Sequence, residues 1–430
     1  MNTTDGDEGG GVPTTGRHDP YLALRYRDFR LLTMGTFVAA LGSQMVGVAV
    51  GWELYELTNS EFALGLVGLV QIVPVLLLSL YAGQIADRFD RKRILIGTQL
   101  VLALCSLGLA WWSFTDGPLV LAYGCLLLIG IARAFGGPAG SALMPQMVPP
   151  TAFMNAATWS SSSGQLASVL GPALGGLVIA QSNSALGVFL VEAVAVLIFS
   201  GFLLLIPRRV VAAVSEPISK ESLLAGLHFI RRTKVLLAAL TLDLFAVLLG
   251  GATVLLPVFA KDVLHVDATG LGILRTAPSV GAILVAVVLA HRPPFKRAGP
   301  ALLWTVAGFG AATVVFGLSQ SFWLSVVMLI LLGAFDGVSM VIRETLQLVK
   351  TPDAMRGRVN AVEGTFVGAS NELGAFESGT LAALTTPIFT VVSGGIGTLV
   401  VVIAVALMWP QLRQLGEIRE EEESVVGTAG

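Results

Sequence analysis

Long apolar segments separated by short polar stretches occupy almost the whole chain. A helix needs about 20 apolar residues, at a rise of 1.5 Å each, to cross the ~30 Å hydrocarbon layer of a bilayer, and it satisfies its own backbone hydrogen bonds there. Twelve segments meet this requirement, near residues 31–54, 62–86, 94–115, 119–138, 156–181, 185–206, 235–259, 268–290, 300–318, 322–343, 359–383 and 387–409. We therefore predict an all-α membrane protein with twelve transmembrane helices.

The composition agrees with this prediction. Of the 430 residues, 54% are hydrophobic and only 13% are charged, which is more apolar than water-soluble domains are. The net charge of -2 and the lack of a long basic block argue against a nucleic-acid partner. Cys105 and Cys125 both lie inside apolar segments, with no disulfide or metal-ligand spacing, so we expect no metal and no cofactor.

The positions of lysine and arginine predict the orientation of the helices. Arg133 and Arg275 lie inside predicted helices and Lys261 lies in a loop on one side, whereas every other basic residue lies in loops or termini on the opposite side. Because basic residues in short loops are retained in the cytoplasm, both termini are predicted to be cytoplasmic.

The chain also repeats itself. Gly68 and Pro74 recur 204 residues later as Gly272 and Pro278. At an offset of 203 residues, three further glycines recur: Gly130, Gly171 and Gly176 fall on Gly333, Gly374 and Gly379. These matches predict two pseudo-symmetric halves of six helices each, with the same orientation in the membrane.

The repeat and the polar stretches set the predicted domain boundaries. An acidic, Gly- and Thr-rich start without an apolar stretch indicates a disordered tail instead of a cleavable signal, and an amphipathic helix is expected at 219–232 in a cytoplasmic linker. The predicted division is a cytoplasmic tail 1–30, a six-helix bundle 31–206, a linker 207–234, a second six-helix bundle 235–409 and an acidic cytoplasmic tail 410–430.

Charge is concentrated in the loop between the second and third predicted helices, where six of the seven residues from Asp87 to Arg93 are charged. The four basic residues alone would hold this loop in the cytoplasm. This explanation leaves Gly83 and Asp87 unexplained. We expect Gly83 to let its helix approach a neighbour closely, and Asp87 to interact with a helix N-terminus or a nearby arginine.

This loop resembles the signature of the major facilitator superfamily, Gly-x-x-x-Asp-Arg-x-x-Arg-Lys. The matching residues are Gly83, Asp87, Arg88, Arg91 and Lys92. A second stretch in the fifth helix is similar to the Gly-Pro-x-x-Gly-Gly motif of antiporter members, and its residues are Gly164, Gly171, Pro172, Gly175 and Gly176. Tight helix packing and a kink are the alternative explanation of this second stretch.

Within the superfamily, the chain looks most like the siderophore and drug exporters of the enterobactin-exporter and macrolide-efflux type, at residues 52–60, 226–236 and 355–360. The resemblance implies a monomer in a bacterial inner (plasma) membrane, in contact with membrane lipids. It also implies a central cavity lined by helices one, four, seven and ten, and a charged loop that latches one conformation.

Charged side chains inside predicted helices are candidates for function, because each costs roughly 2.5–3.5 kcal/mol near the bilayer centre on insertion scales and needs a partner or a wet cavity. The cavity candidates are Arg133, Asp243, Arg275, Asp336, Glu372 and Glu377. Arg133 and Asp336 coincide under the 203-residue offset, so we expect them to pair across the cavity. Since arginine stays protonated, Asp336 and Asp243 are the leading proton sites.

Other acids have simpler explanations. Glu372 and Glu377 could serve helix packing, and Glu53, Glu192 and Glu363 lie near predicted helix ends, where they are expected to extend towards the interface. The middle of the first helix, where several multidrug antiporters of the superfamily carry an acid, offers only Ser43 and Gln44.

The function that these features favour is secondary active export of an amphiphilic drug- or siderophore-like molecule, by alternating access in exchange for protons. The sequence has no Gly-x-x-x-x-Gly-Lys-Ser/Thr motif for a nucleotide. A lipid or lysolipid flippase is the alternative, and a non-transporting sensor or scaffold is a third possibility. An enzyme is not expected, because all four histidines lie outside the helix centres.

Overall fold

The computed structural model describes residues 19–207, 220–293 and 295–418, and these residues contain no strand. The first half of the chain contains α1 (Arg27–Thr58), α2 (Glu61–Arg88), α3 (Arg91–Thr115), α4 (Leu119–Leu143), α5 (Phe153–Ser182) and α6 (Leu186–Leu205). The second half contains α7 (Lys220–Arg232), α8 (Lys234–Leu249), α9 (Leu256–Val258), α10 (Ala268–Ala290), α11 (Ala298–Leu318), α12 (Phe322–Lys350), α13 (Asp353–Leu384), α14 (Pro387–Met408) and α15 (Pro410–Arg413).

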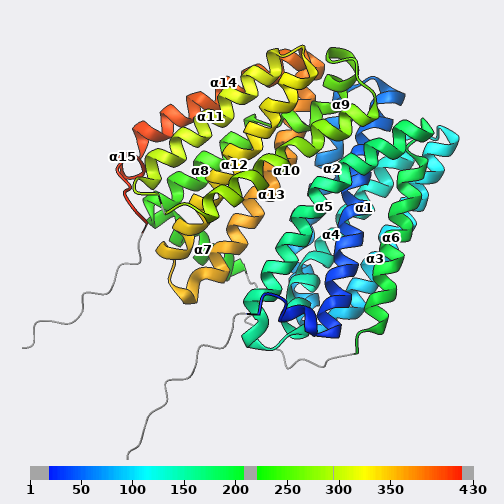
Figure 1. Ribbon diagram of the computed structural model, residues 1–430, viewed down its shortest axis with the longest axis horizontal. Helices are drawn as coiled ribbons and strands as arrows, with labels where there is room; N and C mark the ends of the chain where they lie inside the picture. Colours follow the sequence, from blue (N-terminus) through cyan, green and yellow to red (C-terminus); the bar gives the residue numbers. More distant parts are fainter. Residues whose placement is uncertain (1–18, 208–219, 294, 419–430) are drawn as a thin grey trace, which may run out of the picture.

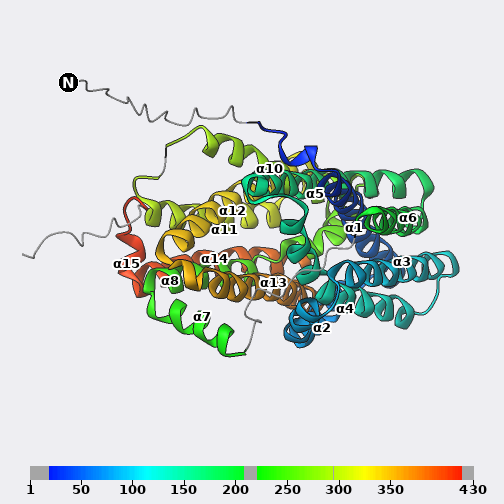
Figure 2. The same cartoon turned by 90° about the horizontal axis from the view of Figure 1, so that it is seen from below.

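The long helices form two bundles, α1–α6 and α8–α14, as predicted (Figure 1). Both described chain ends lie on one side of the molecule, which we call the terminal side, and the opposite side is the distal side. The bundles meet along two pairs of helices, α2 with α13 and α5 with α10 (Figure 2). Towards the terminal side the two bundles diverge (Figure 1).

Three helices end at a residue in the left-handed conformation, and a short distal loop follows each of them. Asn59, Asp116 and Asn183 have φ angles of 45°, 46° and 50°, and they follow α1, α3 and α5. Asparagine and aspartate tolerate this conformation better than other residues with a side chain. These positions reverse the chain tightly, so consecutive helices pack as antiparallel neighbours.

Within the described residues, eleven segments are long and apolar enough to cross a membrane. The twelfth predicted segment, 359–383, is helical within α13, but it does not reach that apolarity. Its 32-residue helix is long enough to span, and its polar residues include Asn371 and Glu372, which line a cavity. The helix α13 is therefore less apolar than the other long helices because it lies between the two halves, where its polar residues line a cavity.

The seventh predicted segment is broken, whereas a single helix was expected over 235–259. α8 ends before Gly250 and Gly251, and the chain continues through a 3-10 turn, the short α9 and a π-helical turn η5 (Phe259–Val263). A Cβ atom at Gly251 would lie 2.7 Å from the carbonyl oxygen of Gly374, so the break brings the chain against α13. Adjacent glycines favour such an interruption.

The predicted tails are partly packed against the bundles. Residues 1–18 and 419–430 lie outside the described residues, but the carbonyl oxygen of Pro20 accepts hydrogen bonds from Asn155 Nδ2 at 2.7 Å and Trp159 Nε1 at 3.0 Å. Leu412 is fully buried. The ordered core therefore extends beyond the predicted boundaries 30 and 410.

The predicted linker contains a helix that belongs to the second half. Residues 208–219 lie outside the described residues, and α7 follows them. Ile230 of α7 is buried with Val359 and Val362 of α13, and a Cβ atom at Gly226 would lie 2.7 Å from the carbonyl oxygen of Arg358. The amphipathic helix thus packs along the terminal end of α13.

The repeated residues make equivalent contacts in the two halves. Gly130 of α4 faces Pro74 of α2, with 2.8 Å between a Cβ atom at Gly130 and the proline ring. In the second half, Gly333 of α12 faces the backbone of Pro278 of α10. The sequence repeat therefore marks positions where two helices approach closely.

Two glycine pairs join the halves on the distal side. A Cβ atom at Gly176 of α5 would lie 2.9 Å from the Cα atom of Gly272 of α10. A Cβ atom at Gly379 of α13 would lie 2.6 Å from the Cα atom of Gly65 of α2. Real Cβ atoms do not approach other atoms this closely, so any side chain at these positions would separate the backbones.

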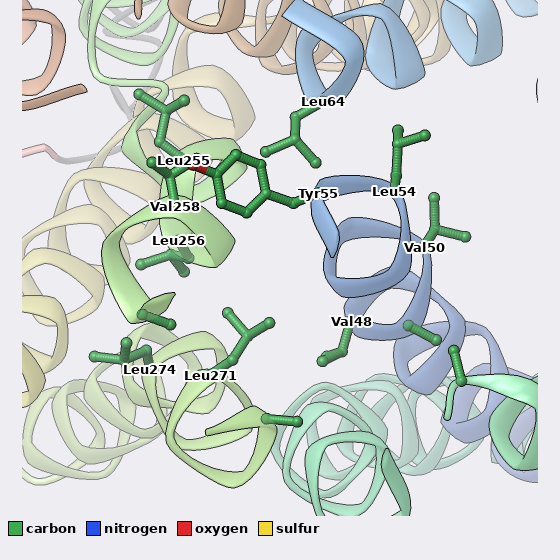
Figure 3. Close-up of a cluster of buried hydrophobic side chains, with 14 of the residues drawn as sticks. Val48, Val50, Leu54, Tyr55, Leu64, Leu255, Leu256, Val258, Leu271 and Leu274 are labelled. Atoms are coloured by element: carbon green, nitrogen blue, oxygen red, sulfur yellow. The ribbon is translucent and has the colours of Figure 1, made fainter. Parts of the chain in front are cut away.

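An apolar cluster covers these glycine contacts (Figure 3). Val48 and Tyr55 of α1 and Leu64 of α2 face Leu256, Leu271 and neighbouring apolar residues of the second half, and all of them are buried. Dispersion contacts at native packing density stabilise helix association where lipid offers little hydrophobic drive. The distal side is consequently closed in this conformation.

We predict that Gly176→Val opens the distal side, because the added side chain meets the backbone of α10. Distances between spin labels on Asp116 and Gln320, two exposed distal residues of opposite halves, should increase relative to the parent protein. Gly164→Val in the same helix is the matched control, since a Cβ atom at Gly164 meets no atom within 4 Å. Equal distances in the two variants would contradict the proposed role of the glycine contact.

Candidate functional site

A central cavity of about 590 Å³ lies between the two halves. Helices α1, α2, α4 and α5 contribute to its wall from the first half, and α10 and α13 from the second. Its charged residues are Arg133, Arg275 and Glu372. Their uncharged polar neighbours are Ser43, Gln44, Gln71, Ser168, Thr253, Ser279 and Asn371.

Arg133 of α4 is held by side chains of its own half. Its Nη1 donates to Gln71 Oε1 at 2.9 Å, and its Nη2 donates to Ser43 Oγ at 3.2 Å. Both acceptors are neutral, so the guanidinium keeps its positive charge in the cavity without a hydrogen-bonded acid in these contacts. Such a group can bind an anionic or acceptor-rich ligand.

Two charged side chains of the second half reach across to glycines of the first. A Cβ atom at Gly47 of α1 would lie 3.1 Å from Nη1 of Arg275, and one at Gly68 of α2 would lie 2.8 Å from Oε2 of Glu372. The glycines leave the space that these side chains occupy. With two arginines and one glutamate, the cavity carries an excess of positive charge.

A second charged cavity, of about 570 Å³, lies within the second half between α8, α12 and α13. Asp243 of α8 forms an ion pair with Arg343 of α12, with 2.5 Å between Oδ2 and Nη1, and both side chains are at most 8% exposed. Asp336 and Glu363 line the same cavity. The cavity therefore contains several acids, one buried arginine, Arg343, and a half-buried one, Arg356.

The predicted pair between Arg133 and Asp336 is not formed, and that expectation was wrong for this conformation. Arg133 lines the central cavity, whereas Asp336 lines the cavity of the second half. The repeat places the two residues at equivalent positions of α4 and α12, but only Arg133 reaches the cavity between the halves, whereas Asp336 lies within the second half. Glu377 lines neither cavity, and its Oε2 accepts a hydrogen bond from Ser378 Oγ at 3.3 Å.

Arg343 was missed by the sequence analysis because the predicted helix ended at residue 343. The helix continues to Lys350, which places Arg343 two turns inside it. Asp336, Arg343 and Gln347 recur at spacings of seven and four residues, which put them on one helix face. This spacing in the sequence could have indicated that Arg343 belongs to the same polar helix face as Asp336.

Two acids predicted to extend towards the interface have other surroundings. Glu192 of α6 is buried, with 5% exposure, against Gly42 of α1. Glu53 accepts hydrogen bonds from Ser113 Oγ at 2.7 Å and from the backbone N–H of Ala185 at 3.2 Å, at the start of α6. Both acids therefore contact other helices or loops of the first half.

The basic residues of the charged loop bind helix ends of the first half. Arg91 Nη1 donates to the carbonyl oxygen of Ala142 at 3.0 Å, near the end of α4. Lys92 Nζ donates to the carbonyl oxygens of Leu204 and Ile206, at 3.2 and 2.5 Å, at the end of α6. Cations at helix C-termini satisfy free carbonyls and interact favourably with the helix dipole.

Gly83 does not have the close neighbour that we expected, because a Cβ atom there would meet nothing within 4 Å. The two halves diverge on this terminal side, which explains the open space. The side chain of Asp87 lies outside the described residues, and Arg88 ends α2. The latch function of this loop therefore stays a prediction.

Three glycines of the second motif serve helix packing, whereas a Cβ atom at Gly164 meets nothing within 4 Å. A Cβ atom at Gly171 would lie 2.9 Å from the carbonyl oxygen of Leu41, and one at Gly175 would lie 3.0 Å from the Cα atom of Met45, both in α1. Pro172 lines the central cavity, and Gly176 contacts α10. The motif thus fixes α5 between the first helix of its own half and the opposite half.

Polar contacts close the distal side between the halves, and the sequence did not predict them. The hydroxyl of Tyr55 in α1 donates to Asp262 in η5. Beside it, Lys261 Nζ lies 2.8 Å from Glu56 Oε2 and 5.8 Å from the ring centroid of Tyr55. We call these four residues the distal latch. Lys261 is the basic residue that departs from the charge bias of the loops.

Comparison with known proteins agrees with this architecture. Residues 18–424 match the family described as transmembrane secretion effector. The chain belongs to this family of major facilitator transporters. It is 26% identical over 392 residues to the enterobactin exporter EntS of Shigella boydii serotype 18 and of Escherichia coli O157:H7, a match that covers 90% of this chain and 92% of each relative.

Solved structures of other transporters share the fold. A POT family transporter superposes with a TM-score of 0.70 at 12% identity, covering 90% of this chain and 96% of that one. A bacterial homologue of the iron transporter ferroportin, in an inward-facing state, gives 0.67 at 16% identity, covering 88% and 98%. The relatives and structural neighbours are transporters, not enzymes.

We predict that Tyr55→Phe combined with Asp262→Asn weakens the distal latch of the transporter, because both partners of the hydrogen bond between the halves are lost. The distance between labels on Asp116 and Gln320 should shift towards longer values. Tyr123→Phe is the control, since Tyr123 donates its hydroxyl hydrogen to Ala63 within one half. A shift of the same size in this control would show that the effect is not specific to the latch.

Proposed function

We propose that this transporter exports an amphiphilic, siderophore-like molecule through the central cavity. The observation that carries the proposal is that Arg133 and Arg275, from opposite halves, line one cavity with a single acid, Glu372. A ligand with several oxygen acceptors or negative charge fits this surplus of donors. Similarity to enterobactin exporters over nine-tenths of the chain supports the direction and the class of substrate.

Alternating access is the proposed mechanism. The units that move are the two halves, with predicted boundaries 31–206 and 235–409. In this conformation the glycine pairs and the distal latch hold the halves together on one side, while the halves diverge towards the terminal side (Figure 1). Rocking about the cavity would exchange these contacts for contacts on the terminal side, where the charged loop with Asp87 lies.

We further propose that protons drive export and that the acids of the second half carry them. Arg343 pairs with Asp243 in this conformation, and Asp336 lies two turns earlier on the same face of α12. Protonation of Asp243 would release Arg343, which could then pair with Asp336 instead. The two aspartates thereby compete for one cation, and the exchanged proton decides which of them holds it.

We predict that Arg133→Ala and Arg275→Ala each weaken substrate binding at least about tenfold, the effect expected when a charge-assisted hydrogen bond is lost. Enterobactin is the probe, and binding to the purified transporter is measured at equilibrium. Arg292→Ala, an exposed arginine in a loop, is the control. Unchanged affinity in both cavity variants would contradict the central site, and transfer of a labelled lysolipid between leaflets in its place would favour the flippase.

Asp336→Asn should abolish export driven by a proton gradient in liposomes, whereas exchange of substrate down its own gradient continues. The reason is that the amide mimics a permanently protonated acid but leaves the cavity shape unchanged. Asp243→Asn, measured in parallel, tests the competing position. Full proton-driven export by a well-folded Asp336→Asn protein would transfer the role to Asp243, and full activity of both variants would exclude the cluster.

We propose that both termini are cytoplasmic in a bacterial inner membrane, so that the terminal side faces the cytoplasm. A single cysteine at Arg93, in a variant with Cys105 and Cys125 replaced by serine, should resist an impermeant maleimide added to intact cells. It should react after the membrane is permeabilised. A cysteine at Asp116 should show the opposite pattern, and labelling of position 93 in intact cells would reverse the orientation.

A further inference from the structure

A third cavity, of about 630 Å³, lies entirely within the first half. Its wall comes from α1, α3, α4, α5 and α6, and it extends from Thr33 and Met144, near the terminal ends of their helices, to Glu192 in α6. It adjoins the central cavity, and Arg133 lines both. Its volume lies in the range of sites that hold drug-sized molecules, about 300–1,000 Å³.

Three polar side chains of this wall are buried without a complete set of partners. Glu192 Oε2, Gln99 Oε1 and Thr33 Oγ1 form no hydrogen bond, and the three residues are 5%, 8% and 7% exposed. They come from three different helices, α6, α3 and α1. Native proteins rarely leave buried polar atoms unpaired, so three in one wall indicate a site for a ligand.

The unpaired atoms define the chemistry of that ligand. An amide carbonyl oxygen accepts hydrogen bonds and does not donate them. The same holds for a glutamate oxygen when the acid is ionised. The nearest cation that lines the cavity, Arg133, donates its Nη1 and Nη2 to Gln71 and Ser43. The site therefore has a surplus of acceptors and needs a ligand that donates.

The rest of the wall is mostly apolar. It includes Leu102, Ile129, Val196 and Phe199. A small hydrated ion would leave these side chains in contact with water, whereas an organic molecule would cover them. Together, the carboxylate, the acceptors and the apolar wall match a cationic head on an apolar body.

We propose that the cavity of the first half is a second ligand site, which binds an elongated apolar molecule with a protonated amine at one end and a hydroxyl donor at the other. This site is distinct from the arginine-rich central cavity and selects the opposite charge. Glu192 lies against Gly42, nine residues after Thr33 in α1, so about 13 Å separates the two ends of the site along the helix. Glu192 takes the ammonium group, Gln99 and Thr33 accept hydrogen bonds from the donor at the other end, and the apolar wall holds the body.

The test uses 6-(aminomethyl)-2-naphthol as the probe, which carries an amine at one end and a hydroxyl at the other, with equilibrium binding to the purified full-length transporter followed by probe fluorescence. Glu192→Gln keeps the shape of the side chain and removes its charge, so amine affinity should fall at least about tenfold. Naphthalenemethanol has the same rings without the charge and should bind weakly and equally to both proteins. Glu53→Gln is the matched control, because Glu53 has its own partners outside the cavity.

Gln99→Leu keeps the carboxylate of Glu192 and removes one hydrogen-bond acceptor from the cavity. This variant tests the proposal if Glu192→Gln does not fold. Amine affinity should fall severalfold, as for a neutral hydrogen bond. Parent-like affinity in the folded variants would overturn the proposal. Loss of proton-driven export in Glu192→Gln at unchanged amine affinity would also overturn it and make Glu192 a proton site. Binding at equilibrium needs no transport, so failure here leaves the proposed export function untouched.

Discussion

Close contact between helix backbones at glycines is the interaction on which the rest of this structure depends. Lipid is as apolar as leucine, so helices in a membrane associate through dispersion and backbone proximity more than through hydrophobic burial. Gly176 with Gly272, and Gly65 with Gly379, let the two halves touch on the distal side. Because each contact is small and joins two otherwise separate bundles, the halves can part there without any helix unfolding.

The same glycines make room for the charges. Arg275 and Glu372 occupy space beside Gly47 and Gly68, and Glu192 lies against Gly42. A charged side chain in a membrane requires a partner or a wet cavity, and each half of this protein supplies its own. The arrangement separates a central cavity with surplus positive charge from acid-containing cavities within the halves. Under the proposed mechanism, substrate and proton would therefore bind at different places and act on the same rocking motion.

Much of the fold could be predicted from the sequence because hydropathy and length determine which segments cross a membrane. The repeat was equally informative: Gly130 and Gly333 each face the proline of the neighbouring helix, as their common spacing indicates. The break of the seventh segment was not predicted, although the adjacent glycines Gly250 and Gly251 were a usable signal. Hydropathy measures the average of a window and does not show where a helix is interrupted.

The candidate site was predicted less well, because the position of a residue along a predicted helix indicates its depth in the membrane but not the direction in which its side chain points. Arg133 and Asp336 occupy repeat-equivalent positions, yet they line different cavities. Arg343 was overlooked because it was the last residue of a predicted helix that in fact continues for seven more residues, to Lys350. The contacts of Arg91 and Lys92 with helix ends, and the distal latch, depend on packing between helices distant in the chain.

Alternating access between the halves is the central claim, and one measurement tests it most directly. Two label pairs are placed in a variant without native cysteines, Asp116 with Gln320 on the distal side and Met154 with Lys296 on the terminal side. Saturating enterobactin in an imposed proton gradient should lengthen the distal distance and shorten the terminal one in the same population. Distances that change in the same direction, or do not change while export proceeds, would contradict this account.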